Sequence, residues 1–406
     1  MRIGTFTLTI LTFIFLLALL NGFWLSRLFR TEWRRIFRWS YAGLTLLSAA
    51  AYLGVRVTGQ FDGPGSLSLL FYFGPFWTVL QLMLIVSWPF SKLLGLVQKR
   101  WELFKQINEQ EQPQNSAAAA MNLPMTRRVF ISHAAIVPPI AMTGINTLGL
   151  VDAEVRSVLR RIDLAYDSLP GGLAGLKIGH MTDVHIGPYV SAKDIQHMGC
   201  LLLQESPDLF AITGDLVDDV KHLPAAMEAL QPLMTKVRLG TWFCMGNHEH
   251  IRGPVQIRRI LQQYGVNILD NRCQRLSFDS ADFYVAGVDY PMNVNTAARQ
   301  IAAKEYIATA CAKIPSEQFT LLLAHHPDFL PAAFSRDIRL TLAGHTHGGQ
   351  VGWGRRSALD FLYPYMRGVY QEGHNMAFVS SGAGHWLPFR LNCPPEVSLI
   401  TLQQKA

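Results

Sequence analysis

"LKIGHMTD", residues 176–183, is a short apolar run that ends at an aspartate, and the same design returns in "PDLFAITGD", residues 207–215. Apolar runs of this length predict buried β-strands. The stretch between them, residues 191–206, has the apolar spacing of an amphipathic helix. Alternating strands and helices therefore predict an α/β domain, which we place at residues 155–406.

Five predicted strands of this domain end in Asp, Asn or His. The other three lie in "GTWFCMGNHEH" (240–250), "QFTLLLAHHPD" (318–328) and "IRLTLAGHTHG" (338–348). Because the carboxyl ends of strands in an open α/β sheet gather at one edge, we expect these polar side chains to cluster there. The expected cluster is Asp183, His185, Asp215, Asn247, His325, His345 and His347.

Carboxylate and imidazole groups in one cluster suit divalent ions such as Mn, Fe or Zn. The cluster is larger than one four- to six-coordinate ion needs, so the pattern predicts two divalent cations. Each position alone has a plain structural explanation: Asp183 could cap a helix, and His325 could be a satisfied core histidine. Only the recurrence at five strand ends favours metal. Gly214, Gly246 and Gly344 each precede a candidate ligand, as tight turns require.

The ordered motifs resemble those of the calcineurin-like metallophosphoesterases. They are D-x-H at 183–185, G-D-x-x-D at 214–218, G-N-H-E at 246–249, a single histidine at His325 and G-H-T-H at 344–347. Less specific motifs extend the resemblance to about residue 402 and are similar to those of membrane-anchored or exported bacterial phosphohydrolases. The resemblance implies a sandwich of two mixed β-sheets flanked by helices, preceded here by a transmembrane helical region.

The resemblance also implies a ligand set and a reaction. One ion would be held by Asp183, His185 and His347, the other by Asn247, His325 and His345, with Asp215 bridging the two. A hydroxide bridging the ions would attack a phosphomonoester, a phosphodiester or a pyrophosphate, and His248 would protonate the leaving oxygen. The expected catalytic residues are therefore His248, Asp215 and Asn247. Asp218 and Glu249 are expected to orient ligands, and His180, His250, His374 and His385 to be structural or substrate-facing. His326 occupies a variable position of the family pattern and is expected to be a neighbour of the ligand His325.

The first 151 residues have a different composition. Four stretches carry no Asp, Glu, Lys or Arg: 3–25, 39–55, 63–91 and 129–151. A helix needs about 20 apolar residues to span a bilayer, and the alternative for each stretch is a buried core helix. We expect a transmembrane region of about three helices at 1–104 and a polar linker at 105–128. Residues 129–151, preceded by the twin arginines of "MTRR", form a signal-anchor-like fourth segment.

Charge is distributed unevenly along the chain. Residues 1–128 hold 13 Lys and Arg against 5 Asp and Glu, whereas residues 129–406 hold 23 against 24. The C-terminal portion offers no basic stripe for a phosphate backbone, so nucleic acid is not an expected partner. Basic residues follow the first and third apolar stretches. Since Lys and Arg accumulate on the cytoplasmic side, we expect a multi-pass protein of the inner (cytoplasmic) membrane with its catalytic domain on the periplasmic, extracytoplasmic side.

Several alternatives stay open at this point. The substrate could be a phosphorylated small molecule or a phosphorylated lipid, and Arg355, Arg356 or Arg390 could grip a second phosphate. Residues 353–365 suit a membrane-contacting loop and a folded hydrophobic corner equally well. A catalytically inactive metal-binding sensor or adaptor, or a transporter with an accessory domain, would share these features. A domain facing the cytoplasm would suit a UDP-diacylglucosamine-type pyrophosphohydrolase. The oligomeric state is open.

The five cysteines form no CxxC pair, and Cys200 and Cys244, which lie in apolar runs, are expected in the core.

Overall fold

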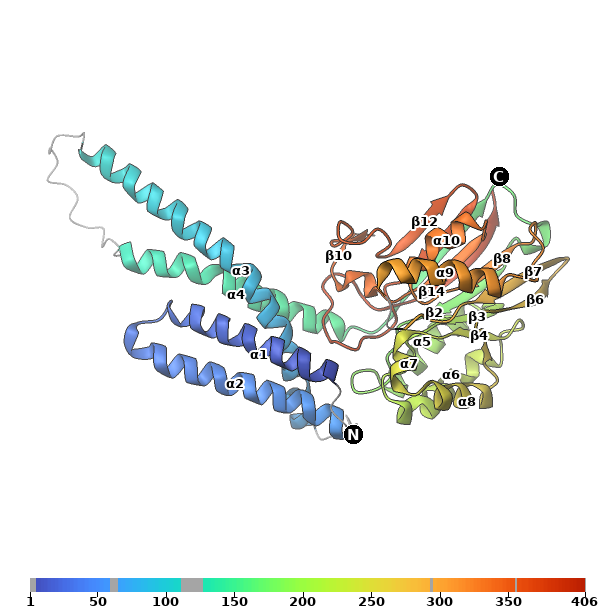
Figure 1. The fold of residues 1–406 in the computed structure, drawn as a ribbon, viewed down its shortest axis with the longest axis horizontal. Coiled ribbons are helices and arrows are strands. Elements are labelled where there is room, and N and C mark those ends of the chain that lie inside the picture. The colour runs from blue at the N-terminus through green and yellow to red at the C-terminus, as the bar shows by residue number, and fades with distance from the viewer. Residues whose placement is uncertain (1–4, 59–64, 111–126, 293–294, 355, 406) are drawn as a thin grey trace. The chain divides into compact units, whose positions relative to one another are not determined.

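The computed structural model describes residues 5–58, 65–110, 127–292, 295–354 and 356–405 (Figure 1). The chain divides into two compact units, Met1–Leu148 and Gly149–Ala406. We call the first the helical unit and the second, after the activity that the family resemblance implies, the catalytic unit, and we describe each by itself.

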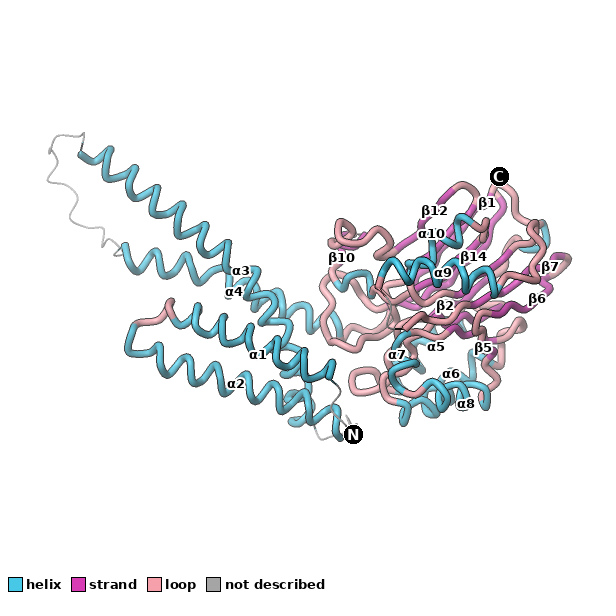
Figure 2. The backbone as a smooth tube through the Cα atoms, viewed as in Figure 1, coloured by secondary structure: helices cyan, strands magenta, loops and turns pink. Residues whose placement is uncertain are grey.

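The helical unit is built from long helices, drawn in cyan in Figure 2. They are α1 (Thr5–Ser26), α2 (Thr31–Thr58), α3 (Gly65–Gln110) and α4 (Arg127–Ala153), whose last residues belong to the catalytic unit. Helix α3 continues past residue 91, where the uncharged stretch ends, because the Leu, Lys, Gln, Arg and Glu residues that follow are good helix formers.

Neutral polar side chains link the helices of this unit. Gln81 on α3 accepts a hydrogen bond from Tyr41 Oη on α2 at 2.8 Å and another from Asn21 Nδ2 on α1 at 3.1 Å. Trp77 Nε1 donates to Thr45 Oγ1 at 3.2 Å. Interhelical bonds of this kind stabilise helix association where apolar packing alone gives little specificity.

Two helices of the described residues are long and apolar enough to cross a membrane. They are Phe71–Val97 within α3 and Ile136–Ala153 within α4, and a shorter apolar helix covers Leu11–Ser26. Residues 39–55 lie in α2, whose first two turns contain Glu32, Arg34, Arg35 and Arg38. The expected total of four spans stays a prediction.

The catalytic unit contains two mixed sheets that are six-stranded across the described residues. The first has the order β1 (Val158–Tyr166), β14 (Glu396–Gln404), β2 (Lys177–Met181), β3 (Leu209–Thr213), β4 (Thr241–Cys244) and β5 (Asn267–Ile268). The second has the order β12 (Gly368–Glu372), β13 (Asn375–Val379), β9 (Leu340–Ala343), β8 (Thr320–Leu323), β7 (Ala281–Gly287) and β6 (Arg272–Phe278). Strands β2 to β5 run parallel, as do β7, β8, β9 and β13.

The main core lies between the two sheets. Strand β3 illustrates the alternation: Leu209 and Ala211 join the core between the sheets, whereas Phe210 and Ile212 face the helices outside. Helices α5 (Ala192–Gln204), α6 (Leu223–Met234) and α8 (Pro254–Gln263) cover the first sheet. Helices α9 (Thr296–Ala310) and α10 (Leu330–Ser335) cover the second (Figure 1). The predicted sandwich of mixed sheets flanked by helices is confirmed.

The cysteines correct one detail. All five thiols are free, and Cys244 is buried as expected, but Cys200 is exposed. Helix α5 turns Met198, Gly199 and Leu202 towards the sheet, so position 200 falls on the solvent side. An apolar neighbourhood in sequence is therefore a poor guide to burial on an amphipathic helix.

Candidate metal centre

The seven predicted ligands all follow strand ends. Asp183 and His185 follow β2, Asp215 follows β3, and Asn247 opens helix α7 (Asn247–Arg252) after β4. His325 follows β8, while His345 and His347 follow β9. Three of these strands belong to the first sheet and two to the second, so the carboxyl ends of both sheets contribute to one centre.

One group of ligand atoms consists of Asp183, His185 and His347. His185 Nε2 and His347 Nε2 lie 3.1 Å apart, and Asp183 Oδ1 lies 3.6 Å from His347 Nε2 and 4.0 Å from His185 Nε2. All three side chains are buried. The geometry groups the residues that the resemblance assigns to one ion.

A second group consists of Asp215, His325 and His345. His325 Nε2 lies 3.1 Å from His345 Nδ1, and 3.2 Å from both Asp215 Oδ2 and Asn247 Oδ1. Asp215 Oδ2 is also 3.9 Å from His185 Nε2 in the first group. Asp215 therefore lies between the two groups, where a bridging carboxylate would be needed.

The backbone at these positions is strained. Five of the seven residues have positive φ, between 49° and 70°: Asp183, His185, Asp215, His345 and His347. Non-glycine residues rarely adopt this left-handed conformation, and strain of this kind gathers at functional sites. The fold holds these side chains in place against their local preference.

The first group fits a cation. Asp183 Oδ1 is buried and accepts no hydrogen bond among the described residues, and the imidazole nitrogens of His347 and His185 lie 3.6 and 4.0 Å from it. Burial, followed by the His248 charge, lowers the pKa of His185 to about 3, and burial lowers the pKa of His347 well below its usual value. Neutral imidazoles offer lone pairs, so a cation would satisfy both the carboxylate and its neighbours.

The second group also requires positive charge. His325 Nδ1 donates to the Thr213 carbonyl at 2.8 Å, which directs Nε2 towards Asp215. Burial opposes protonation of His325, but the Asp215 carboxylate outweighs burial and raises its pKa to about 10. A proton or a metal ion between Nε2 and Asp215 meets this demand, and a metal ion would have to displace the proton.

Buried hydrogen bonds fix the ligand loops. The Glu249 carboxylate is fully buried and accepts the backbone N–H groups of Asp215, Leu216, Val217 and Gly246 at 2.7–3.1 Å. Asp183 Oδ2 accepts from Thr182 Oγ1 and from the His345 backbone N–H, both at 2.8 Å. Glu249 thus supports the Asp215 loop, in the orienting role expected for it.

Position 344 requires glycine because Asp183 and Thr182 approach its backbone closely. A Cβ at this position would lie 2.1 Å from Asp183 Oδ2 and 2.2 Å from Thr182 Oγ1. Any larger residue would displace a candidate ligand, which explains the glycine before His345.

His248 stands beside both groups. Its Nε2 lies 3.9 Å from Asp215 Oδ2, and its Nδ1 is 2.6 Å from Asp218 Oδ1, which also accepts from Arg252 Nη2 at 3.0 Å. Burial lowers the pKa of His248, but the hydrogen bond to Asp218 and the Asp215 charge outweigh it, so the pKa is raised. Asp218 contacts this histidine, whereas we expected it to orient a metal ligand.

The other histidines lie outside both groups. His180 bonds Thr213 Oγ1 inside the first sheet, His250 pairs with Asp289 at 2.7 Å, and His374 is on the surface. His385 is buried, and its Nε2 is 3.4 Å from Glu154 Oε1. His326 packs against His345 with 4.2 Å between ring centroids.

Arg390 was wrongly interpreted as a residue that could grip substrate. It is 0% exposed and donates to the carbonyls of Ser381, Gly384 and Cys393. Its Nη2 also lies 3.2 Å from His347 Nδ1, so it supports a candidate ligand from behind. Arg356 is exposed, and Arg355 lies outside the described residues.

Sequence reasoning missed a polar group beside the second set of ligands. Arg299 Nη1 on α9 lies 3.0 Å from His326 Nε2 and 2.9 Å from Asp328 Oδ2. The Tyr290 ring lies 5.9 Å from the rings of both His325 and His345. One signal was present: β7 is also followed by an aspartate, Asp289, in the segment that carries Tyr290. The sequence around Arg299 contains no motif that indicates a role at the metal centre.

Comparison with known proteins gives consistent matches. A family model described as calcineurin-like phosphoesterase matches residues 176–349. A protein of Helicobacter pylori named as an uncharacterized metallophosphoesterase is 31% identical over 271 residues, which cover 66% of this chain and 69% of that protein. A Bacillus subtilis protein of similar name is 28% identical, with 58% of this chain and 82% of that protein covered.

One relative is named as a membrane protein. A Danio rerio "transmembrane protein with metallophosphoesterase domain" is 30% identical over 269 residues, which cover 63% of this chain and 60% of that protein. The match therefore spans less than two thirds of that relative's length. Together with the two apolar helices, this likeness indicates that the present chain is membrane-associated. On its motifs, its fold and its relatives, the chain belongs to the calcineurin-like phosphoesterase family of metal-dependent phosphohydrolases.

Proposed function

We propose that this chain is a membrane-anchored phosphohydrolase that uses two divalent cations to cleave a phosphomonoester, phosphodiester or pyrophosphate bond, with a lipid-linked compound as substrate. The ligands of one cation are Asp183, His185 and His347, those of the other are Asn247, His325 and His345, and Asp215 is shared. The observation that carries the proposal is the buried Asp183 Oδ1, which has imidazole nitrogens around it and no hydrogen-bond donor among the described residues.

Mn, Fe and Zn suit the proposed ligands, because each half mixes carboxylate and imidazole groups and one half adds the amide of Asn247. Bound there, two such cations supply Lewis acidity towards phosphoryl oxygens and generate a nucleophile from water near neutral pH.

The protein's own groups orient the ligands and move a proton. Thr213, through its carbonyl, fixes the tautomer of His325 so that the Nε2 lone pair faces the centre. His248, held at Nδ1 by Asp218, carries a proton at Nε2 on the side of Asp215. We assign it as the general acid that protonates the leaving oxygen, which suits its raised pKa.

The two apolar helices and the family likeness to a transmembrane protein support a substrate carried by the membrane. A catalytic unit anchored to a bilayer meets lipid-borne phosphate more often than dissolved phosphate compounds.

The distribution of Lys and Arg supports an inner-membrane, multi-pass topology with the catalytic unit outside the cytoplasm. A periplasm-dependent reporter enzyme fused after residue 406 should be active in cells. A silent periplasmic reporter, with an active cytoplasmic one, would reverse the orientation and favour a UDP-diacylglucosamine-type activity.

The activity is tested with the full-length chain in lipid nanodiscs, supplied with Mn²⁺ and either p-nitrophenyl phosphate or bis(p-nitrophenyl) phosphate. Asp215→Asn should lower turnover sharply, since removal of the shared charge weakens the hold on both cations. Asp279→Asn is a matched control, because Asp279 has the same φ of 50° as Asp215 and a 61% exposed side chain.

Equal turnover by the wild type and Asp215→Asn would contradict the proposed chemistry. If neither protein hydrolyses either probe although both cations are bound, the alternative of a metal-binding sensor or adaptor would be favoured.

A further inference from the structure

One loop of the catalytic unit exposes large apolar side chains. Trp353 is 80% exposed, Phe361 79% and Leu362 65%. The loop begins after the 3-10 turn η4 (His347–Gln350) with the short strands β10 (Gly352–Trp353) and β11 (Arg356–Ser357). Three such side chains stand on one short segment, whereas Trp386 is the only other exposed Trp, Phe or Tyr residue among the described residues of this unit. We call the described residues 353, 354 and 356–362 the apolar loop.

The apolar loop is anchored to the metal centre at both ends. It follows the η4 turn that contains His347, and the segment after it returns to Thr346, whose Oγ1 donates to the Met366 carbonyl at 2.5 Å. Tyr363 Oη donates to Asp328 Oδ1 at 2.6 Å, and Asp328 pairs with Arg299 beside the second group of ligands. The loop is therefore held at a set position relative to the centre.

The base of the loop also adjoins the end of α4. Within the catalytic unit, the Arg390 backbone N–H donates to the Gly149 carbonyl at 2.8 Å, and the Asn392 N–H donates to Asp152 Oδ2 at 3.0 Å. The intervening residue, Leu391, pairs with Gln350 and Gly352 through backbone bonds of 2.8 Å.

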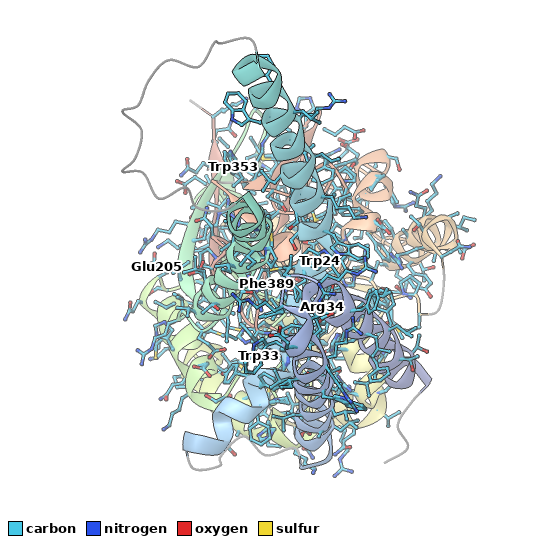
Figure 3. All side chains as sticks on the ribbon, turned by 90° about the vertical axis from the view of Figure 1, so that its left-hand side faces the viewer. Trp24, Trp33, Arg34, Glu205, Trp353 and Phe389 are labelled. Atoms are coloured by element: carbon cyan, nitrogen blue, oxygen red, sulfur yellow. The ribbon has the colours of Figure 1, made fainter. Side chains whose placement is uncertain are left out.

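Side-chain packing also connects the end of α4 to this segment. A Cβ on Gly149 would lie 2.2 Å from the Phe389 ring, so helix and ring are in close contact. Phe389 and Trp353, from the two segments concerned, are labelled in Figure 3. One segment, residues 389–392, thus joins the end of α4 to the start of the apolar loop.

We propose that the apolar loop is a second contact of the catalytic unit with the bilayer, beside the point where α4 leaves it. The apolar window of α4, Ile136–Ala153, ends at residues that Arg390 and Asn392 contact, and these two flank Leu391, which pairs with the segment before the apolar loop. Trp and Phe side chains flanked by a basic residue, here the exposed Arg356, suit the interface between acyl chains and anionic head groups. This inference rests on the membrane anchoring proposed above, and it would direct the metal centre to phosphate groups of the same bilayer.

The test attaches a bimane fluorophore to single introduced cysteines of the full-length chain in nanodiscs, without added metal. Cys200, the exposed native thiol, is first replaced by serine. Labels at Phe361→Cys and, independently, Leu362→Cys should lose emission when the phosphatidylcholine is replaced by phosphatidylcholine brominated on its acyl chains. The matched control is Val255→Cys on α8, 81% exposed, whose label should keep its emission.

A label at Ile140→Cys, 65% exposed within the apolar window of α4, reports on the anchor itself. Quenching at position 140 without quenching at 361 and 362 would overturn the inference and leave the anchoring intact. Absence of quenching at all positions would overturn the anchoring as well. Because no turnover is measured, neither outcome depends on the proposed chemistry.

Discussion

The helical unit and the catalytic unit differ in the polar groups that their described residues bury: those of the first are neutral, whereas the second also buries ionisable groups. The buried polar side chains among the described residues of the helical unit are all neutral, such as Asn21 and Gln81. Its outer surface carries large apolar side chains, including Leu46 and Leu96. The catalytic unit buries carboxylates and imidazoles instead, and the apolar loop is a local exception on its surface.

The difference follows from what surrounds each unit. Neutral amides and hydroxyls can satisfy one another inside a bundle that faces lipid, where charge would be costly. A buried carboxylate such as Asp183 needs a positive partner, and its Oδ1 accepts no hydrogen bond within the described part of the protein. The helical interior is thus built for packing, whereas the catalytic interior is built for a ligand. Substitutions inside the catalytic unit should therefore lower turnover, whereas substitutions inside the helical unit should lower stability.

The largest effect is expected at His248. His248→Gln removes the proton donor and should lower kcat for an alkyl phosphate by about 10²–10⁴-fold. The loss should be smaller for p-nitrophenyl phosphate, whose leaving group needs little protonation, and the bound metal should stay unchanged. His250→Gln is the control, since His250 pairs with Asp289 outside both ligand groups. An equal loss with both substrates would show that His248 is not the acid.

Gly344 probes how tightly the catalytic interior is shaped. Gly344→Ala would force Asp183 away from its position, and a misplacement of this order costs roughly 10²-fold in rate. Steady-state kinetics and far-UV circular dichroism should show a folded, impaired protein. Gly171→Ala, where an added Cβ meets no atom within 4 Å, should behave as wild type. Full activity of Gly344→Ala would mean that the centre tolerates displacement of Asp183.

The smallest effect is expected in the helical unit. Gln81→Leu removes the acceptor of Tyr41 and Asn21 and should destabilise this unit by about 1 kcal/mol, as interhelical hydrogen bonds in membranes do. Thermal unfolding in nanodiscs measures the change. Turnover per folded molecule should equal that of the wild type. A large loss of turnover would contradict the separation of roles between the two interiors.

The fold and the ligand cluster were predictable because their signals are local. An apolar run followed directly by Asp or His marks a strand end, and parallel strand ends converge, so Asp183 and His345 could be brought together from residues 162 positions apart. The division of the five strands between two sheets is not a local property. The family resemblance implied two sheets, but the strands could not be assigned to one or the other because their ends look alike in sequence.

Roles that depend on distant contacts were harder to predict. Arg390 resembles a substrate-binding arginine in sequence, but residues 381–384 and 393 enclose it. Asp218 contacts His248 because two loops after different strands meet. Arg299 contacts His326 and Asp328, beside the second group of ligands, from a helix whose sequence has no motif. In each case a tertiary contact between separate segments decides the role.

The most direct test of the two-cation centre is elemental analysis of the pure full-length chain, before and after incubation with manganese, iron or zinc and removal of the excess. The seven ligands predict two equivalents of metal per chain, with a reduced content in Asp215→Asn and an unchanged content in Asp279→Asn. One equivalent or fewer in the wild type, for every metal tried, would contradict the centre as described.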